Sequence, residues 1–238
     1  MPQRLVAFVL LGVACAAFAA DQKPDEAKMA APKAEYEKQE IHGWTVFVDK
    51  RLLTEKALRG ADALELLRAK LFEIQLLVPA RAVAELKKVH IYMDSGDPRH
   101  PGCCYHPSKE WLVEHGYPAE KAKTVQVSNP ATFLAWTRDQ PGMVLHEMAH
   151  AYHHQVLGYD NAEIKAAYKQ AVESKTYDAV LHISGKTERH YAMNNDQEYF
   201  AEMSEAYFTG NDFYPFVRGE LRKHDPTMFA LVKKLWER

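Results

Sequence analysis

The chain has 238 residues, of which 30 are Lys or Arg and 32 are Asp or Glu, so its formal net charge at pH 7 is −2. This near-neutral balance, without a basic cluster, an internal repeat or a glycine-rich phosphate loop, gives no support to a nucleic-acid-binding protein. Hydrophobic residues make up 47% of the chain, which is enough for the core of a globular domain.

The first twenty residues have the organisation of a secretory signal peptide. Arg4 supplies a short basic start, residues 5–18 form an apolar run, and Ala17 to Ala19 match the small-x-small rule for cleavage. The run is too short to span a bilayer comfortably, so we expect no membrane span after its removal. We predict cleavage after Ala19 or Ala20 and a secreted protein, extracellular or periplasmic. Loss of Arg4 changes the formal charge from −2 to −3.

Cys15 raises the alternative of a lipoprotein anchored through this residue. The apolar run before Cys15 is short, and Gly12 is a poor residue three positions before a lipidated cysteine. We therefore expect export without a lipid anchor.

Residues 21–40 mix Lys, Glu, Ala and Pro with a single Met and a single Tyr. So few apolar side chains cannot form a core, and we predict a disordered linker. The remaining residues, 41–238, are enough for one domain with a substantial core.

Periodicity within 41–238 predicts a small sheet followed by a helical half. Strands are expected at 44–48, 89–93 and 124–128, and helices at 54–77, 108–115, 139–157, 162–174, 196–208 and once or twice more before the end. Strands first and helices later indicate an α+β domain with its site on the helical side. In 124–128 polar and apolar residues alternate, which is typical of a strand with one face in water.

Two adjacent cysteines, Cys103 and Cys104, lie in a Pro- and Gly-rich loop and are the cysteines that remain after export. Neighbouring cysteines cannot join distant parts of a domain; they stay as thiols, form a strained vicinal ring or bridge two chains. Because His100 and His106 lie nearby, a second metal site is an alternative to loop residues that pack beside a cleft.

The helix predicted at 139–157 has signals at both ends. Thr137 or Asp139 offers an N-cap, Pro141 stands in the first turn, and Gly158 follows the last turn.

Residues 146–150, within this helix, read His-Glu-Met-Ala-His. The spacing of four residues places the imidazoles of His146 and His150 on one face, one turn apart, where both can bind one tetrahedral zinc ion. Glu147 can then reach a zinc-bound water and act as general base. The motif predicts two metal ligands and a catalytic base on a single helix.

Two histidines leave a zinc ion under-coordinated, so a third protein ligand must come from elsewhere. A histidine six positions after His150, the metzincin arrangement, is excluded because Val156 stands there.

The helix predicted at 196–208 has three acids on one stripe at about 100° per residue, Glu198, Glu202 and Glu205, with apolar neighbours. Such a row of acids is unfavourable to bury unless a cation or hydrogen-bond donors meet it. The alternative is a solvated acidic face. Because two histidines upstream already offer a metal site, we favour a metal ligand on this stripe.

His146-Glu-x-x-His150 followed by Glu198-Tyr-Phe-Ala-Glu202 resembles the gluzincin type of zinc metallopeptidase, in particular the catalytic domain of anthrax lethal factor and the related Pro-Pro endopeptidases. The motifs cover about the last hundred residues. The resemblance implies a zincin-like metallopeptidase domain in which Glu198 is the third zinc ligand and Glu202 a supporting carboxylate. It also implies that Tyr191, seven residues before the ligand glutamate, stabilises an oxyanion.

The chemistry that the resemblance implies is hydrolysis of a peptide or protein substrate with one zinc ion per chain. The ion lowers the pKa of a bound water towards about 7, Glu147 takes the proton, and Tyr191 donates a hydrogen bond to the tetrahedral oxyanion. These motifs are specific for zinc-dependent peptide hydrolysis and do not select a substrate.

Four further histidines lie close to these motifs in the sequence. His153 lies seven positions after His146, so it is a candidate to hydrogen-bond Glu202; the alternative is an ordinary surface histidine. His182 and His190 are alternatives to Tyr191 as the oxyanion donor. His154 is expected to face solvent.

In zincin-like proteases the strand before the metal helix forms the edge of the cleft, so the resemblance implies that an extended substrate pairs with 124–128. The alternative is an ordinary sheet strand.

Two other functions use the same sequence features. One is a secreted binding protein that keeps the fold without turnover, although an intact Glu147 and Tyr191 argue against it. The other is a zinc amidase that acts on cell-wall peptides with the same chemistry.

Overall fold

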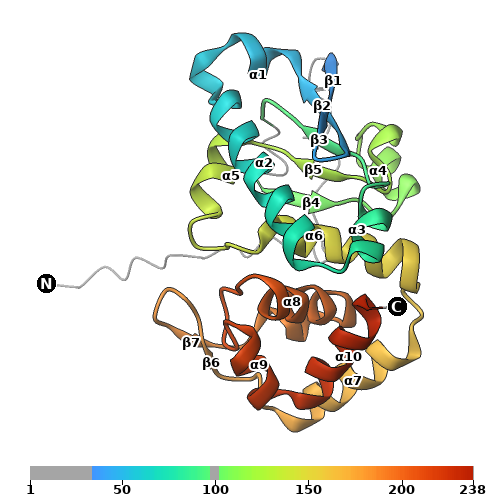
Figure 1. Ribbon diagram of the computed structural model, residues 1–238, viewed down its shortest axis with the longest axis vertical. Coiled ribbons are helices and arrows are strands. Elements are labelled where there is room, and N and C mark those ends of the chain that lie inside the picture. The colour runs from blue at the N-terminus through green and yellow to red at the C-terminus, as the bar shows by residue number, and fades with distance from the viewer. Residues whose placement is uncertain (1–33, 97–101, 238) are drawn as a thin grey trace, which may run out of the picture.

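The computed structural model describes residues 34–96 and 102–237 (Figure 1). The predicted signal peptide at 1–20, with Cys15, and the part of the predicted linker before residue 34 lie outside the described residues. They stay predictions.

Five strands form a mixed sheet in the order β1-β2-β3-β5-β4. They are β1 (Tyr36–Ile41), β2 (Trp44–Asp49), β3 (Ile91–Met93), β4 (Cys103–Tyr105) and β5 (Val125–Val127). β2, β3 and β5 run parallel, whereas β1 pairs with β2 and β4 pairs with β5 in antiparallel fashion. The register aligns Val46 with Ile91 and Ile91 with Val125, so buried apolar side chains form rows across the sheet.

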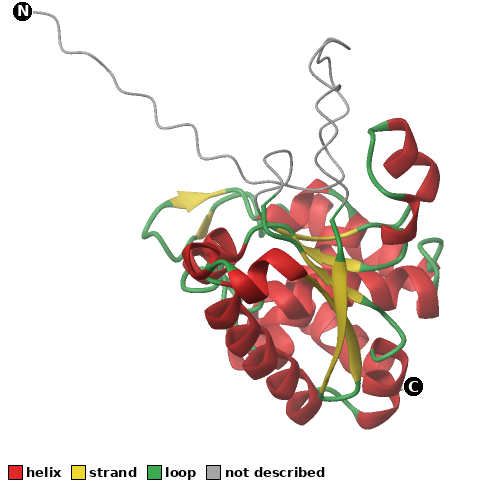
Figure 2. Cartoon of the chain, turned by 90° about the horizontal axis from the view of Figure 1, so that it is seen from above, coloured by secondary structure: helices red, strands yellow, loops and turns green. Residues whose placement is uncertain are grey.

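Helices surround the sheet and then form the second half of the chain (Figures 1 and 2). The first half has α1 (Lys50–Thr54), α2 (Gly60–Leu77), α3 (Ala80–Leu86), α4 (Lys109–Glu114) and α5 (Pro130–Trp136), with 3₁₀ turns at Lys56–Leu58 and Ala119–Lys121. The second half has α6 (Met143–Tyr152), a π-helical turn (His153–Leu157), α7 (Ala162–Ser174), the hairpin β6 (Val180–Leu181) and β7 (Thr187–Glu188), a 3₁₀ turn (Tyr191–Asn194), α8 (Asp196–Phe208), α9 (Arg218–His224) and α10 (Pro226–Trp236). The predicted α+β class, a small sheet followed by a helical half, is confirmed.

α6 lies between the two halves of the molecule (Figure 1). It contacts β4, α2 and α3 on the sheet side and α8 on the helical side. Met148 and Ala149 of α6 and Phe200 and Ala201 of α8 are fully buried. The hydrophobic contact between α6 and α8 therefore fixes these two helices against each other.

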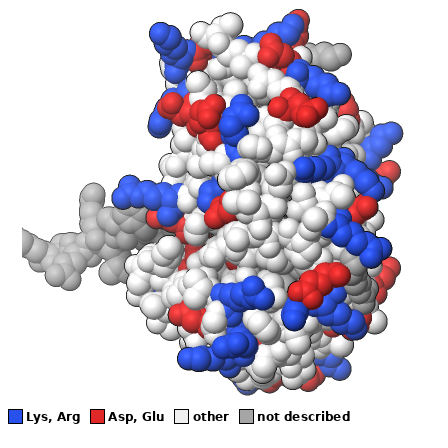
Figure 3. Space-filling model, in the orientation of Figure 1, with Lys and Arg blue, Asp and Glu red and all other residues white. Residues whose placement is uncertain are grey.

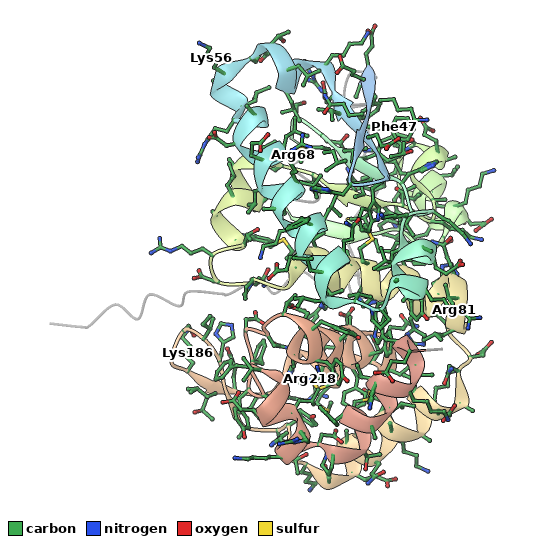
Figure 4. The ribbon with its side chains drawn as sticks, viewed as in Figure 1. Phe47, Lys56, Arg68, Arg81, Lys186 and Arg218 are labelled. Carbon is green, nitrogen blue, oxygen red and sulfur yellow. The ribbon has the colours of Figure 1, made fainter. Side chains whose placement is uncertain are left out.

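α9 and α10 hold the far side and the end of α8. The guanidinium of Arg218, labelled in Figure 4, lies 4.2 Å from the centre of the Tyr207 ring and donates a hydrogen bond of 2.7 Å to its hydroxyl. Trp236 donates from its indole nitrogen to the Ser204 hydroxyl at 3.0 Å. α8 is thus held along its length.

The surface agrees with the near-neutral composition. On the face shown in Figure 3, basic and acidic side chains are interspersed, without one large area of a single sign. Within the described residues, none of the helices combines the length and the apolar character that crossing a bilayer requires.

The predicted linker at 21–40 extends too far, because Tyr36–Ile41 forms the strand β1, which pairs with β2. The Tyr36 hydroxyl donates to Asp94 at 2.6 Å, and the Lys50 amide donates to the Glu35 carbonyl at 2.9 Å. The charged composition indicated disorder, but β1 is an edge strand. Its outward side chains stay in water while its backbone pairs with β2. The domain therefore begins at least six residues before the predicted start at 41.

The strand predicted at 124–128 exists as β5, but the expected edge position and wet face are wrong. β5 lies between β3 and β4, and all three of its residues are buried. Gln126 is inside because its side chain has polar partners: its carbonyl oxygen lies 2.6 Å from His106 Nε2, and its amide donates to Asp94. The edge is β4, in a segment whose Pro and Gly content had suggested a loop.

The long helix predicted at 54–77 is interrupted. α1 ends at Thr54, and α2 starts at Gly60 after Arg59 adopts a left-handed conformation with φ of 55°. A Cβ atom at Gly60 would lie 2.3 Å from the Leu52 carbonyl oxygen, so the chain can fold back on α1 only with glycine there.

We predict that Tyr36→Phe lowers the free energy of unfolding by about 1–3 kcal/mol, because it leaves a buried carboxylate oxygen of Asp94 without its donor. Denaturant unfolding followed by circular dichroism measures this change. Lys38→Gln, an exposed position on the same strand, is the control and should have no effect. Equal stability of both variants would mean that the segment behaves as the linker that its composition suggested.

Candidate metal centre

α6 presents His146, Glu147 and His150, but it begins later than the sequence indicated. The helix starts at Met143 with Gly142 at the N-cap, and the expected caps, Thr137 and Asp139, are wrong. The reason is that α5 runs to Trp136 and the amides of Asp139 and Gln140 both donate to the Trp136 carbonyl, which closes a turn before α6. At the other end the structure does place Gly158, with φ of 81°, after the π-helical turn.

α8 brings Glu198 to the two histidines. The side chain of Asn195 accepts hydrogen bonds from the amides of Gln197 and Glu198, at 2.9 and 2.8 Å, and so caps the helix N-terminus. Glu198 is therefore fixed in the first turn, where its charge is also favourable to the helix dipole, and it is 4% exposed.

Three candidate ligand atoms lie within reach of one ion. His146 Nε2 is 3.0 Å from His150 Nε2 and 3.1 Å from Glu198 Oε2, and His150 Nε2 is 3.3 Å from the same oxygen. In a tetrahedral zinc site with bonds of about 2.0–2.1 Å, neighbouring ligand atoms are about 3.3 Å apart. The spacing of these three atoms therefore fits zinc.

The chemistry of the three atoms also calls for a cation between them. His146 Nδ1 lies 2.6 Å from Glu205 Oε1, so it carries a proton that it donates to that carboxylate. In the neutral ring Nε2 then presents a lone pair to His150 Nε2 and to the Glu198 carboxylate. Such facing lone pairs repel unless a proton or a metal ion lies among them. The donor set of His146, His150 and Glu198 thus fits a zinc ion.

The local charges shift the pKa values of the two central groups in opposite directions. Burial favours the neutral form of Glu198, but the attraction of His150 and the hydrogen bonds of both histidines outweigh it and hold the pKa of Glu198 well below its usual range. Burial lowers the pKa of His146, but its contacts with Glu198 and Glu205 outweigh this and raise that pKa well above the usual value. The pocket therefore favours an ionised carboxylate beside positive charge.

Glu147 points its carboxylate towards the edge strand. It is 9% exposed, and its Oε2 accepts a hydrogen bond of 2.7 Å from the backbone amide of Tyr105 in β4. This charge-assisted bond orients the carboxylate next to His146 in the chain. No sequence pattern indicates this contact, because β4 is not among the predicted strands.

Tyr191 opens the 3₁₀ turn directly before α8, and its ring centre is 6.5 Å from that of His146. The two histidines that were alternatives to Tyr191 have other roles. His190 is fully buried and accepts from the Ala192 amide at 3.1 Å, and burial lowers its pKa to about 3. His182 contacts the Ser184 hydroxyl at 2.7 Å and lies 3.5 Å from Asp212.

His153 does face α8, as its spacing predicted, but the expected hydrogen bond to Glu202 is not present. The imidazole is fully buried and packs against the rings of Tyr159 and Phe200, with centres 5.0 and 5.1 Å away. Within the described part of the chain neither ring nitrogen has a hydrogen-bond partner. Burial, followed by repulsion from His150, lowers the pKa of His153 to about 3. It is a neutral core residue.

His154 is half-buried instead of facing solvent. Its Nδ1 lies 2.8 Å from the Tyr105 hydroxyl, and its ring stacks on that of Tyr159. The π-helical turn is thus tied to the edge strand β4.

The other two acids of the α8 stripe lie behind the candidate ligands. Glu202 accepts a hydrogen bond of 2.8 Å from Asn211, and its Oε1 is 3.6 Å from His146 Nδ1. Burial, with repulsion from Glu205 and Asp212, raises the pKa of Glu202 well above the usual value. Burial, opposed by His146, raises the pKa of Glu205 to about 7. The sequence motifs did not predict the close contact of Glu205 with His146. The position of Glu205 on the same helical stripe as Glu198 was the feature that could have indicated it.

The paired cysteines lie in β4. Cys104 is buried, with its Sγ 3.5 Å from His106 Nε2, and neither cysteine forms a disulfide within the described residues. Neighbours on a strand point to opposite faces, which disfavours a vicinal ring. Two groups of the described residues could hold a metal ion: His146 with His150 and Glu198, and His146 with Glu202 and Glu205. Neither group includes Cys103, Cys104 or His106, and His100 lies outside the described residues.

Comparison with solved structures finds similarity to a protein described as the Pro-Pro endopeptidase PPEP-2 from Paenibacillus alvei. The TM-score is 0.44 and the sequence identity 18%, over 74% of this chain and 90% of that chain. No family model matches the sequence, and no curated protein matches it significantly. The interpretation of the site therefore depends on its own geometry.

The buried neutral state of His153 predicts acid sensitivity. Its pKa is about 3 in the folded chain and 6.5 in the unfolded chain, so below pH 6.5 the unfolded state binds a proton that the folded state does not. Stability from this residue is thus complete above pH 6.5 and falls by about 1.4 kcal/mol per pH unit down to pH 3. His153→Phe, which keeps an aromatic ring between Tyr159 and Phe200, should shift the acid unfolding midpoint to lower pH.

Acid unfolding followed by far-UV circular dichroism measures that shift. The exposed His115 provides a control, since His115→Phe should leave the midpoint unchanged. A midpoint that does not move in His153→Phe would contradict the neutral, buried state of this histidine.

Proposed function

We propose that this protein is a zinc-dependent peptidase. The observation that carries the proposal is the approach of His146 Nε2, His150 Nε2 and Glu198 Oε2 to 3.0–3.3 Å of one another, with Glu147 beside the first histidine on the same helix. The resemblance of these motifs to the gluzincin peptidases supports the same reaction class.

His146, His150 and Glu198 would hold the zinc ion. Bound there, zinc supplies a Lewis acid that polarises a peptide carbonyl and makes water acidic enough to be deprotonated near neutral pH. Glu147 takes the proton from the attacking water and gives it to the amine that leaves when the C–N bond breaks. The bond from the Tyr105 amide holds one oxygen of Glu147, so that the carboxylate keeps its orientation through both transfers.

Tyr191 is the proposed donor to the oxyanion that forms at the attacked carbonyl. Two observations support this role: the ring centre of Tyr191 is 6.5 Å from that of His146, and Tyr191 opens the turn that leads into α8. A hydrogen bond to the developing negative charge is stronger in the transition state than in the substrate complex, so it raises turnover more than substrate affinity.

For the substrate we propose an extended peptide that adds to β4. β4 pairs with β5 along one side and is the last strand of the sheet, next to Glu147. Strand addition places an extended chain alongside the last strand of a sheet. Because the Tyr105 amide is already bonded to Glu147, the peptide would lie alongside β4 next to that carboxylate. This replaces the pairing with 124–128 that the sequence suggested.

Two other functions are compatible with the same residues. A zinc amidase acting on cell-wall peptides would use the same three ligands and the same base. A binding protein without turnover would not need Glu147 held by a backbone amide. Export through the signal peptide at 1–20 stays a prediction from the sequence.

The proposal predicts that Glu147→Gln binds about one zinc per chain, as the unaltered protein does, but loses peptide hydrolysis by at least about 10²-fold. Zinc content by atomic emission and cleavage of a mixed peptide library measure the two properties on the same samples. Library cleavage that is equal in both proteins would remove Glu147 from the mechanism. Cleavage of muropeptides but not of library peptides would select the amidase.

Tyr191→Phe should lower kcat by about 10²–10³-fold with little change in KM, because the lost hydrogen bond exists mainly in the transition state. Tyr168→Phe is a matched control: the Tyr168 hydroxyl donates to the Met193 carbonyl of the same 3₁₀ turn at 3.0 Å. Steady-state kinetics on one cleaved peptide gives both constants. An equal fall of kcat in both variants would mean that the effect comes from a disturbed 3₁₀ turn and not from lost oxyanion stabilisation.

A further inference from the structure

Two carboxylates lie near the ring nitrogen of His146 that faces away from the candidate metal. Glu205 Oε1 is 2.6 Å from His146 Nδ1, which is a hydrogen bond, whereas Glu202 Oε1 is 3.6 Å away, which is not. The family resemblance implies that Glu202 is the carboxylate that supports the metal site. The distances instead favour Glu205 as the acid that holds His146.

Asn211 explains why Glu202 does not come closer. The amide nitrogen of Asn211 donates to both the side chain and the backbone carbonyl of Glu202, each at 2.8 Å. Asn211 is itself 3% exposed, so this contact is fixed within the core. Glu202 is thereby held to the loop after α8, and Glu205 has the direct contact with the histidine.

Gly142, the N-cap of α6, provides the space for Glu205. A Cβ atom at Gly142 would lie 2.1 Å from Glu205 Oε2 and 2.7 Å from its Cδ, so any side chain there would displace the carboxylate. The backbone of Gly142, with φ of −85° and ψ of −3°, is one that other residues adopt. Glycine is therefore required here for space and not for conformation.

We propose that Glu205 is the positioning residue of the metal site, and that Gly142 is the residue that admits it. Glu205, 4% exposed, holds the proton of His146 on Nδ1 and fixes the ring, so that Nε2 points at the ion with its lone pair. The inference rests on the proposed zinc site and deepens it: metal affinity depends on an acid seven residues beyond the ligand Glu198 and on a glycine four residues before His146.

The test measures the zinc dissociation constant of the purified chain by competition with a chromogenic chelator at pH 7. Glu205→Ala and Glu205→Gln should bind zinc about 10–100-fold more weakly. Glu202→Gln, a matched change one turn earlier on α8, should weaken binding by less than about threefold. Gly142→Ala should weaken binding in the same direction as the Glu205 variants, because it moves the carboxylate without removing it.

A double variant separates this role from a general effect on folding. If Gly142 acts only by admitting Glu205, then adding Gly142→Ala to Glu205→Ala should change the zinc affinity by less than about twofold. Two independent losses that multiply would overturn the assignment of Gly142. If Gly142→Ala does not fold, the comparison of the Glu205 and Glu202 variants still decides the role of Glu205.

The visible spectrum of the cobalt-substituted chain is the second measurement, because it reports the ligand geometry and not overall stability. The spectra of the Glu205 variants should differ from that of the unaltered chain, while the Glu202→Gln spectrum should not. Unchanged zinc affinity and cobalt spectrum in the Glu205 variants would overturn this inference alone. Failure of the unaltered chain to bind zinc would overturn the proposed function as well.

Discussion

The structure depends on the close approach of three metal-seeking atoms in a site shielded from bulk water. His146 and His150 on α6 and Glu198 on α8 bring two imidazole nitrogens and a carboxylate oxygen to 3.0–3.3 Å of one another. Without a proton or a metal ion among them such a cluster is unfavourable, because lone pairs and negative charge face each other away from water. A bound metal ion would convert the same cluster into a stabilising contact between the two halves of the chain.

Most of the helical half can be understood as the support that this approach requires. The Asn195 cap sets the first turn of α8, and the stacking of Trp236 on Tyr152, with ring centres 4.3 Å apart, joins α10 to α6. On the sheet side β4 meets α6 through the bond from the Tyr105 amide to Glu147. The candidate ligands come from the helices and the orientation of the proposed base from the sheet, so the proposed site needs both halves.

The sequence predicted those features that depend on local spacing. The α+β class, α8 and its stripe of three acids follow from periodicity, and the two histidines follow from the motif around His146. The choice of Glu198 among the acids came from the family resemblance. What it missed depends on tertiary pairing. β1 carries a linker-like composition, β4 lies in a segment rich in turn residues, and His153 faces α8 as expected but meets Phe200 instead of an acid. The hydrogen bond of Glu205 needs Gly142, which precedes the motif and has no periodic signal.

The most direct test of the account is a crystal structure of the zinc-loaded protein with diffraction recorded on both sides of the zinc absorption edge. The account predicts one anomalous peak, at about 2.0–2.2 Å from His146 Nε2, His150 Nε2 and a Glu198 oxygen. A peak bound to other residues, or a Glu198 carboxylate turned away from both histidines, would contradict it.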